Sequence, residues 1–434
     1  MMFSPATAHL VLALIVALSI VLMLIRPRGI SEVYWIGGGA ILLMVLRLVS
    51  LQMAGRAVAE GLDVYLFLIG MMLVSELASV NGVFDWLSSV AVRGAQRSCA
   101  RLFTLIYGIG TIVTILMSND ATAVVLTPAI LTAVRKAKVE PLPYLFACAL
   151  VANAASFVLP ISNPANLVVF HTGMPPLGRW LLFYGVPSIL SIAATYAVMR
   201  LVFRKDLSAA IEGEVGAEAL KGEGKLVLAG IASMVLVLLV ASSLKKDLGL
   251  PTCLAAIAVT GAVSIKSRSN PIRLARSISW ATLILVAGLF IMVDAVESIG
   301  ALKLTRAWLD RAEQLAPAAG ALIVGFAVGI GNNLVNNLPL GLIAGGTLQA
   351  AHTKGLIAHA VLIGVDLGPN LSVTGSLATI LWLLALRKEK LDVSFWRFLK
   401  VGAIAMPAAL LISIGGAILM QMLFETSSKE IHER

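Results

Sequence analysis

Polar residues of the kinds that bind small solutes interrupt long apolar stretches of this chain at four places. The first cluster is Ser118-Asn119-Asp120, and the second is LPISNPANLVV, with Asn163 and Asn166. Amide and hydroxyl groups donate and accept hydrogen bonds without carrying net charge, which suits a small, hydroxyl-rich or weakly charged solute. The other clusters are GIGNNLVNNLPLG, with Asn336 and Asn337, and DLGPNLSVTGSLA, with Asp366, Thr374 and Ser376.

Glycine and proline near these clusters indicate that the helices are broken there. Inside a bilayer, non-helical backbone survives only where it is buried in protein or lines a cavity. Broken helices present free N–H and C=O groups to such a cavity, and the helix ends add their dipoles. The alternative is that these side chains only hold helices together. We expect a substrate pocket formed by Ser118, Asn119, Asn163, Asn166, Asn336, Asn337, Thr374 and Ser376.

Acidic side chains are costly inside a membrane and usually have a function there. Asp120 and Asp366 lie in the polar clusters, whereas Glu76 and Asp294 lie within other apolar segments. We expect these four residues to carry coupling protons, or, for Asp120 and Asp366, to anchor the broken segments. The alternative is a buried carboxylate that accepts hydrogen bonds from helix N–H groups and never titrates.

The composition indicates that the bilayer is the solvent for most of the chain. Of the 434 residues, 59% are hydrophobic and 13% are charged, which is too apolar for a soluble core. The net charge of +10 comes largely from short loops, so it predicts membrane topology and not a nucleic-acid partner. The three cysteines have no metal-ligand spacing, and we find no nucleophile–base constellation, so we expect no enzyme and no cofactor.

Apolar stretches of about 20 residues, the length of a spanning helix, recur along the whole chain. Two stretches, 102–134 and 319–351, carry a polar cluster at the middle, so each could be two crossings or one re-entrant hairpin. Two of the spanning segments, 142–172 and 356–386, are expected to be broken helices. The predicted spanning segments are 6–25, 33–51, 62–81, 142–172, 180–203, 226–243, 250–265, 278–298, 356–386 and 396–424.

The distribution of Lys and Arg favours hairpins over double crossings. The basic loops all fall on one side of the membrane only if 102–134 and 319–351 return to their own face. The first hairpin then enters from the cytoplasm and the second from outside, and both termini are periplasmic in an inner membrane. The basic loops are 26–32, 83–101, 135–141, 200–225, 266–278 and 387–400.

Residues 66–82 match residues 284–300 at an offset of 218 residues, which pairs Glu76 with Asp294. The two copies run in opposite directions in the charge-based topology, so we predict an inverted repeat, the usual architecture of secondary transporters. The expected divisions are an N-terminal helix 1–32, a first repeat 33–203, a cytoplasmic linker 204–225, a connecting helix 226–249, a second repeat 250–424 and a tail 425–434.

At its four clusters the chain resembles the arsenical pump membrane protein family of the ion-transporter superfamily. The strings that carry the likeness are SNDATAVVLTP (118–128), LPISNPANLVV (159–169), NNLVNNLPLGLIAG (332–345) and DLGPNLSVTGSLATILWL (366–383). The resemblance implies proton-driven export of arsenite and antimonite, two hairpins that face two broken helices, and assembly with a separate arsenite-stimulated ATPase. Related dicarboxylate carriers have Ser-Asn-Thr at the first hairpin, and Asp120 would repel a dianion.

Arsenite is largely a neutral trihydroxide near neutral pH, so Asn, Ser and Thr can bind its hydroxyls. Three convergent thiols would bind it tightly, but Cys99, Cys148 and Cys253 are scattered along the chain. Other readings are a sodium/proton antiporter, an exporter of silicic acid, a passive channel, or the membrane subunit of an ATP-driven pump. No GxxxxGK[ST] string occurs, so any ATPase must be a separate chain.

Overall fold

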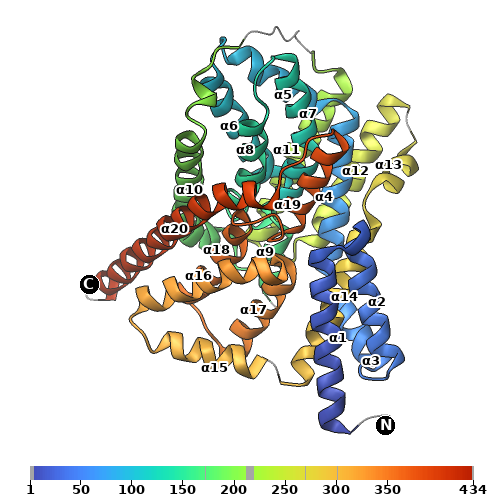
Figure 1. Ribbon diagram of the computed structural model, residues 1–434, viewed down its shortest axis with the longest axis vertical. Helices are drawn as coiled ribbons and strands as arrows, with labels where there is room; N and C mark the ends of the chain where they lie inside the picture. Colours follow the sequence, from blue (N-terminus) through green and yellow to red (C-terminus); the bar gives the residue numbers. More distant parts are fainter. Residues whose placement is uncertain (1–3, 172, 212–218, 269, 301, 433–434) are drawn as a thin grey trace.

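The computed structural model consists of helices and loops in the part of the chain that it describes, residues 4–171, 173–211, 219–268, 270–300 and 302–432. Within these ranges, nine helices are long and apolar enough to cross a membrane. They run mostly along the long axis of the molecule (Figure 1). The predicted all-α polytopic membrane fold is therefore confirmed.

The helices of the first half are α1 (Pro5–Ile25), α2 (Glu32–Val45), α3 (Leu51–Glu60), α4 (Leu62–Val80), α5 (Val83–Gly94), α6 (Cys99–Met117), α7 (Thr127–Lys136), α8 (Leu142–Ala154), α9 (Pro164–Val169) and α10 (Leu177–Val202). Those of the second half are α11 (Gly222–Ser243), α12 (Gly249–Ser267), α13 (Pro271–Ser277), α14 (Trp280–Ser298), α15 (Leu302–Glu313), α16 (Pro317–Val335), α17 (Asn337–Ala351), α18 (Leu356–Leu367), α19 (Leu377–Lys388) and α20 (Phe395–His432).

Local sequence signals explain where several helices begin. The Ser98 side chain accepts a hydrogen bond from the Arg101 N–H and so caps α6. Pro317 occupies the first position of α16, where its missing N–H leaves no bond unmade. Gly82 and Gly300 precede α5 and α15 with φ of 71° and 84°, a backbone conformation that favours glycine.

The 218-residue repeat is present in the helices themselves. The paired helices α4 and α14 each span 19 residues, as do α6 and α16, and each pair starts at the predicted offset. Ser118 and Asn336, which follow α6 and α16, share a positive φ of 106° and 79°. The starts of α10 and α20 keep the offset, and α1 and α11 match it to within one residue. The repeat thus reaches helices that we expected to lie outside it.

The two halves are inverted relative to each other. Tyr65, near the start of α4, packs edge-on against Phe290 in the middle of α14, with ring centroids 6.2 Å apart. Glu76, near the end of α4, shares a cavity with Thr282, near the start of α14. The equivalent helices α4 and α14 are therefore antiparallel, as an inverted repeat requires.

Both predicted hairpins return to the end of the molecule at which they begin. Tyr144, at the start of α8, donates a hydrogen bond to the Cys99 carbonyl at the start of α6, at 3.3 Å. Thr353, just after α17, donates to the Glu313 carboxylate, just before α16, at 2.6 Å. Each hairpin therefore enters the helical bundle, breaks at its polar cluster and comes back.

Two segments differ from the sequence-based prediction, and a third is described only in part. The segment 33–51 is not one span, because α2 ends at Val45 and the amphipathic α3 follows. The final helix α20 continues to His432, into the segment expected to be a tail. Of the linker 204–225, residues 212–218 lie outside the described residues, and the Ile211 N–H donates to the Arg97 carbonyl at 2.9 Å. The described part of the linker thus docks on another basic loop.

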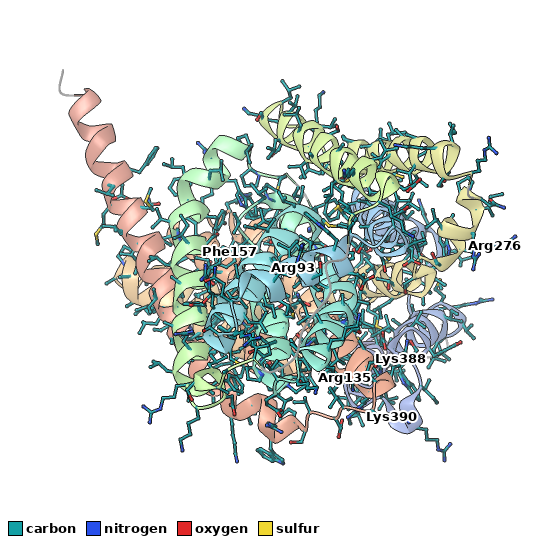
Figure 2. All side chains as sticks on the ribbon, turned by 90° about the horizontal axis from the view of Figure 1, so that it is seen from above. Arg93, Arg135, Phe157, Arg276, Lys388 and Lys390 are labelled. Carbon is teal, nitrogen blue, oxygen red and sulfur yellow. The ribbon has the colours of Figure 1, made fainter. Side chains whose placement is uncertain are left out.

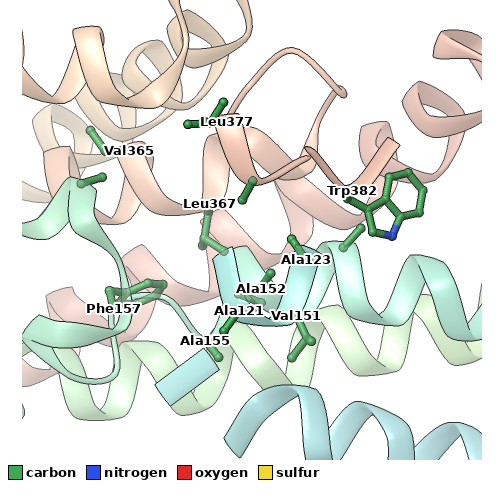
Figure 3. Packing of buried hydrophobic residues seen from close by; sticks show 14 of the residues in the cluster. Ala121, Ala123, Val151, Ala152, Ala155, Phe157, Val365, Leu367, Leu377 and Trp382 are labelled. Carbon is green, nitrogen blue, oxygen red and sulfur yellow. The ribbon is translucent and has the colours of Figure 1, made fainter. Parts of the chain in front are cut away.

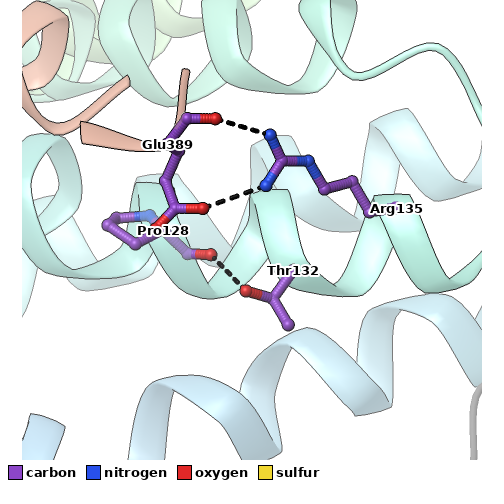
Figure 4. Close-up of polar contacts among 4 residues, drawn as sticks. All are labelled: Pro128, Thr132, Arg135 and Glu389. Carbon is purple, nitrogen blue, oxygen red and sulfur yellow. Dashed lines mark hydrogen bonds and ion pairs between the residues drawn. The ribbon is translucent and has the colours of Figure 1, made fainter. Parts of the chain in front are cut away.

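Contacts place five of the six basic loops, 83–101, 135–141, 200–225, 266–278 and 387–400, at one end of the molecule. Figure 2 shows Arg93, Arg135, Arg276, Lys388 and Lys390 in the view from above. Contacts join several of these loops directly. Arg135 forms an ion pair with Glu389 at 2.9 Å and also donates to the Glu389 carbonyl at 2.8 Å, close to the bond between Thr132 and Pro128 (Figure 4). We call this end the basic end.

Candidate functional site

The first hairpin breaks at Ser118, directly after α6. Its φ of 106° and ψ of 160° turn the chain, and a π-helix, Ala121–Leu126, follows. The Thr114 and Thr122 hydroxyls pair at 2.8 Å across the turn. Asn119 is buried at 2% exposure, and its side-chain oxygen has no hydrogen-bond partner among the described residues. A continuous α-helix would not form a polar turn at this position.

The second hairpin breaks at Asn336 and is fastened to the second broken helix. The Asn336 side chain donates to the Thr374 carbonyl at 3.3 Å, and the Asn337 N–H donates to the Gly375 carbonyl at 2.9 Å. The Thr374 hydroxyl donates to the Asn333 carbonyl at 3.0 Å. These three predicted residues therefore hold the two breaks together, and the Asn337 side-chain oxygen has no described partner.

The first broken helix is interrupted between α8 and α9. Asn163 caps α9 by accepting a hydrogen bond from the Ala165 N–H at 3.0 Å. Its amide nitrogen donates to the Asp366 carboxylate, which is fully buried. Asn166 donates to the Ser156 carbonyl at 2.9 Å, so it stabilises the non-helical segment between α8 and α9. Asn163 and Asp366 thus join the two halves, while Asn166 stabilises the break itself.

The second broken helix restarts at Ser376, which caps α19. Its hydroxyl accepts from the Thr379 N–H at 3.1 Å. The break packs tightly, because a Cβ on Gly375 would contact the Pro369 backbone. Ser376 is buried at 1% exposure and adjoins Leu377, which lines a cavity. Its position fits a capping role at the edge of the pocket.

A cavity of about 160 Å³ lies where the first hairpin meets both broken helices. Glu76 on α4 and Asp120 and Ser118 at the hairpin break line it together. Pro164 and Leu377, the first residues of α9 and α19, complete it from the two broken helices. Ser277 and Thr282 lie at its basic end, so we call it the basic-end cavity. Among the described residues that line it, none is Lys, Arg or His.

A second and larger cavity of about 730 Å³ lies toward the opposite end. Asp294 lines it, with Glu60, Glu297, His171 and His352. We call it the far-end cavity. Asp294 is the repeat equivalent of Glu76, and Phe290 and Val293 are the equivalents of Met72 and Ser75 in the basic-end cavity. The two cavities are thus related by the inverted repeat.

Small and apolar side chains surround the breaks. Ala121 and Ala123 of the hairpin, Val151 and Ala152 of α8, and Leu367 of α18 pack against one another (Figure 3). All are buried at 2% exposure or less. Polar groups at the breaks therefore face little water beyond the cavities, which strengthens every hydrogen bond they make.

The predicted residues thus fall into three groups. Glu76, Ser118 and Asp120 line the basic-end cavity, and Asp294 lines the other one. Asn163 and Asp366 form a bond between the halves. Asn119, Asn166, Asn336, Asn337, Thr374 and Ser376 lie at the breaks without lining either cavity. Among the described residues, no group of His, Cys, Asp and Glu could hold a metal ion.

Sequence reasoning missed Asn153, and it gave no role to Asn333 and Asn370, which lie within the polar clusters. Asn333 donates to the Gly368 carbonyl at 3.0 Å and accepts from Ser372 at 2.7 Å. Asn153 donates to Asn370 at 2.9 Å. Asn153 lies in the apolar run of α8, so an asparagine at bilayer depth was the signal that could have found it.

Comparisons with known proteins agree with this architecture. A family model described as citrate transporter matches residues 2–365. The arsenical pump membrane proteins of Yersinia enterocolitica and Escherichia coli K12 are each 27% identical over 428 residues, covering 93% of this chain and 97% of theirs. The putative arsenical pump membrane protein of Bacillus subtilis is 22% identical over 420 residues, with coverage of 90% and 94%.

A solved structure shares the fold. The YdaH transporter of Alcanivorax borkumensis, whose topology is described as unusual, superposes with a TM-score of 0.54 at 15% identity. The match covers 88% of this chain and 89% of that one. At this identity the likeness concerns the helical architecture alone. Together with the family match, it identifies a multi-pass membrane transporter and not an enzyme.

Proposed function

We propose, from the premise that the chain belongs to the citrate transporter family, that it exports arsenite and antimonite in exchange for protons. The chain is a secondary transporter, and the proposal concerns its substrate and coupling ion. Arsenical pump membrane proteins are similar to it over nearly the whole chain, which supports an arsenical substrate. The mechanism we propose is alternating access around the helix breaks.

The charge of the basic-end cavity is the observation that carries the choice of substrate. Glu76 and Asp120 line it, and no basic side chain from the described part of the chain does. A citrate anion would meet two carboxylates and no cation there, which costs several kcal/mol for like charges at close range. A neutral trihydroxide is not repelled by the carboxylates, and Ser118 can hydrogen-bond its hydroxyls. The cavity chemistry therefore favours arsenite over citrate.

The two related cavities support alternating access. One reaches Ser118 and Asp120 from the basic end, and the other reaches Asp294 from the far end. In an inverted repeat, exchanging the conformations of the halves exchanges which cavity is open. We place the basic end on the cytoplasmic side of an inner membrane, since basic loops are retained there. The substrate then enters through the basic-end cavity and leaves through the far-end cavity.

Proton coupling is assigned to the acidic residues of the site. Asp120 and Glu76 face the basic-end cavity, and Asp366 is fully buried against Asn163 between the halves. A carboxylate that exchanges its proton with a different side in each conformation couples proton entry to solute exit. Any ATPase partner would be a separate chain that binds at the basic end, because this chain has no phosphate-binding string.

The test is transport into everted membrane vesicles from cells that express the protein. We expect arsenite uptake to rise when the vesicle interior is acidified, and citrate in tenfold excess to leave the rate unchanged. Antimonite should compete with arsenite for uptake. Citrate uptake, or loss of arsenite uptake by competition with citrate, would refute the assignment. Proton flux that needs sodium and ignores arsenite would instead identify a sodium/proton antiporter.

A further inference from the structure

A buried pair of asparagines connects the two broken helices, and neither residue lines the basic-end or the far-end cavity. Asn153 lies in the last turn of α8, and Asn370 lies in the 3₁₀ turn Gly368–Asn370 that follows α18. The Asn153 amide nitrogen donates to the Asn370 side-chain oxygen at 2.9 Å. The Asn370 amide nitrogen in turn donates to the Leu150 carbonyl at 3.1 Å. The pair thus binds one half to the other.

Such contacts are few in the described part of the chain. Two hydrogen bonds between fully buried side chains cross from one half to the other there, Asn153 to Asn370 and Asn163 to Asp366. Asn153 and Asn370 are 1% and 0% exposed. An amide in this environment is costly unless it is bonded, so each residue depends on the other.

The pair is linked on both sides to the site. Asp366 lies one helical turn before Asn370, so a shift of Asn370 moves the carboxylate with it. On the other side, Ser156 donates to the Asn153 carbonyl at 2.7 Å, and Asn166 donates to the Ser156 carbonyl at 2.9 Å. Asn166 belongs to α9, whose cap is Asn163. Both partners of the Asn163–Asp366 bond are therefore placed by the asparagine pair.

We propose that Asn153 and Asn370 are positioning residues that fix one broken helix against the other and so bring Asp366 to Asn163. The inference rests on the proposed function in one respect, because the experiment that tests it measures transport. As long as the two asparagines are hydrogen-bonded to each other, the ends of α8 and α18 move together. Without it, the Asn163–Asp366 contact is made only part of the time, and the rate of the transport cycle falls.

Leucine substitutions separate this role from a purely structural one, because leucine has nearly the shape of asparagine but no hydrogen-bonding group. Asn153→Leu or Asn370→Leu alone leaves a buried polar partner unbonded, so each should lower both the melting temperature and Vmax, the latter about tenfold. Replacing both partners with apolar groups removes the unpaired group, so the double variant should recover its melting temperature. Its Vmax should stay about tenfold low, with KM within about twofold of the parent.

Recovery of Vmax together with the melting temperature in the double variant would overturn the proposal, since the pair would then be structural only. Trp382→Phe is the matched control. It removes another buried bond between the halves, from the Trp382 indole to the Leu145 carbonyl at 3.1 Å, away from Asp366. It should lower the melting temperature and leave Vmax within about twofold.

A further variant tests the proposal if the double leucine variant does not accumulate in the membrane. Asn370→Asp keeps the oxygen that accepts from Asn153, and a buried carboxyl takes up a proton that can replace the amide as donor to the Leu150 carbonyl. This variant should therefore retain at least about a third of the parent Vmax. A tenfold loss in that variant would also contradict the proposal. Failure of the proposed function has a different outcome: the parent protein would then move no arsenite, and the same variants would be compared on whichever solute it does move.

Discussion

Glu76 and Asp294 occupy equivalent positions on the antiparallel helices α4 and α14, yet they line different cavities toward opposite ends of the molecule. The far-end cavity is about 730 Å³ and the basic-end cavity about 160 Å³, so the larger cavity is the one lined by Asp294. Two halves in the same conformation would form cavities of equal size. The difference in cavity volume is therefore what one state of an alternating-access cycle requires.

The first prediction tests which side each cavity faces. Ser75 and Val293 are repeat equivalents next to these carboxylates, and each lines its own cavity. In a background without native cysteines, Ser75→Cys should react with a membrane-impermeant thiol reagent only from the cytoplasm. Val293→Cys should react only from the periplasm, and faster, because its cavity is larger. Labelling of both variants from one side would contradict the inverted arrangement.

The second prediction concerns Asp120, which lines the basic-end cavity at the break of the first hairpin. Asp120→Asn keeps the size of the side chain and removes its titratable proton. We expect arsenite uptake into everted vesicles to lose its dependence on the pH gradient and to fall about a hundredfold or more, the scale for a positioned proton-transfer group. Asp310→Asn on α15 is the control, since Asp310 is exposed and lines neither cavity. Full gradient-driven uptake in Asp120→Asn would remove this residue from the coupling role.

The sequence was sufficient to locate the helix breaks because their cause is local. Ser118 and Asn336 follow apolar helices and adopt a strained backbone conformation, with positive φ and ψ of 160° and 152°, that ends each helix. The charge pattern then distinguished hairpins from double crossings, because basic loops concentrate on one side. The α3 helix was missed, since an amphipathic helix with exposed Gln52 and Arg56 has no long apolar window.

The pairing of distant residues could not be predicted in the same way. Asn153 meets Asn370 only because α8 and the turn after α18 pack together, and no local pattern encodes that contact. Thr374 was expected in the pocket, but its hydroxyl bonds the Asn333 carbonyl. The extension of the repeat to α1 and α11 was also invisible, because it lies in helix lengths and offsets and not in residue identities.

The third prediction is that thiols are not needed for transport. Cys99, Cys148 and Cys253 are buried, and none lines either cavity. The variant with Cys99→Ser, Cys148→Ala and Cys253→Ala should therefore keep arsenite efflux within about twofold of the parent once corrected for expression, since small cavity losses at these sites cost stability and not chemistry. Loss of efflux in a variant that still reaches the membrane would show that arsenite is bound by thiolates after all.

The fourth prediction compares an exposed contact with a buried one. The Arg135–Glu389 pair is 44% and 48% exposed, and ion pairs of this kind contribute about 1 kcal/mol or less. Glu389→Gln should therefore change the melting temperature little, and less still at high salt. Asn332 is fully buried and donates to the Gly364 and Val365 carbonyls, each at 2.9 Å. Asn332→Ala should cost about 1–3 kcal/mol, because two buried carbonyls lose their donor. A larger loss in Glu389→Gln than in Asn332→Ala would reverse this ranking.

The last prediction uses two glycines of α20 to test how closely the second break packs. A Cβ at Gly402 would collide with the Asn370 and Leu371 carbonyl oxygens, which belong to backbone and cannot turn away. Gly402→Ala should therefore push α20 off the break, lowering the melting temperature and, by displacing Asn370, the transport rate as well. A Cβ at Gly415, on the same helix, would meet nothing within 4 Å. Gly415→Ala should stabilise the helix by up to about 1 kcal/mol, because alanine has the higher helix propensity, and should leave transport unchanged. Equal behaviour of the two variants in thermal unfolding and vesicle uptake would mean that α20 does not hold the break in place.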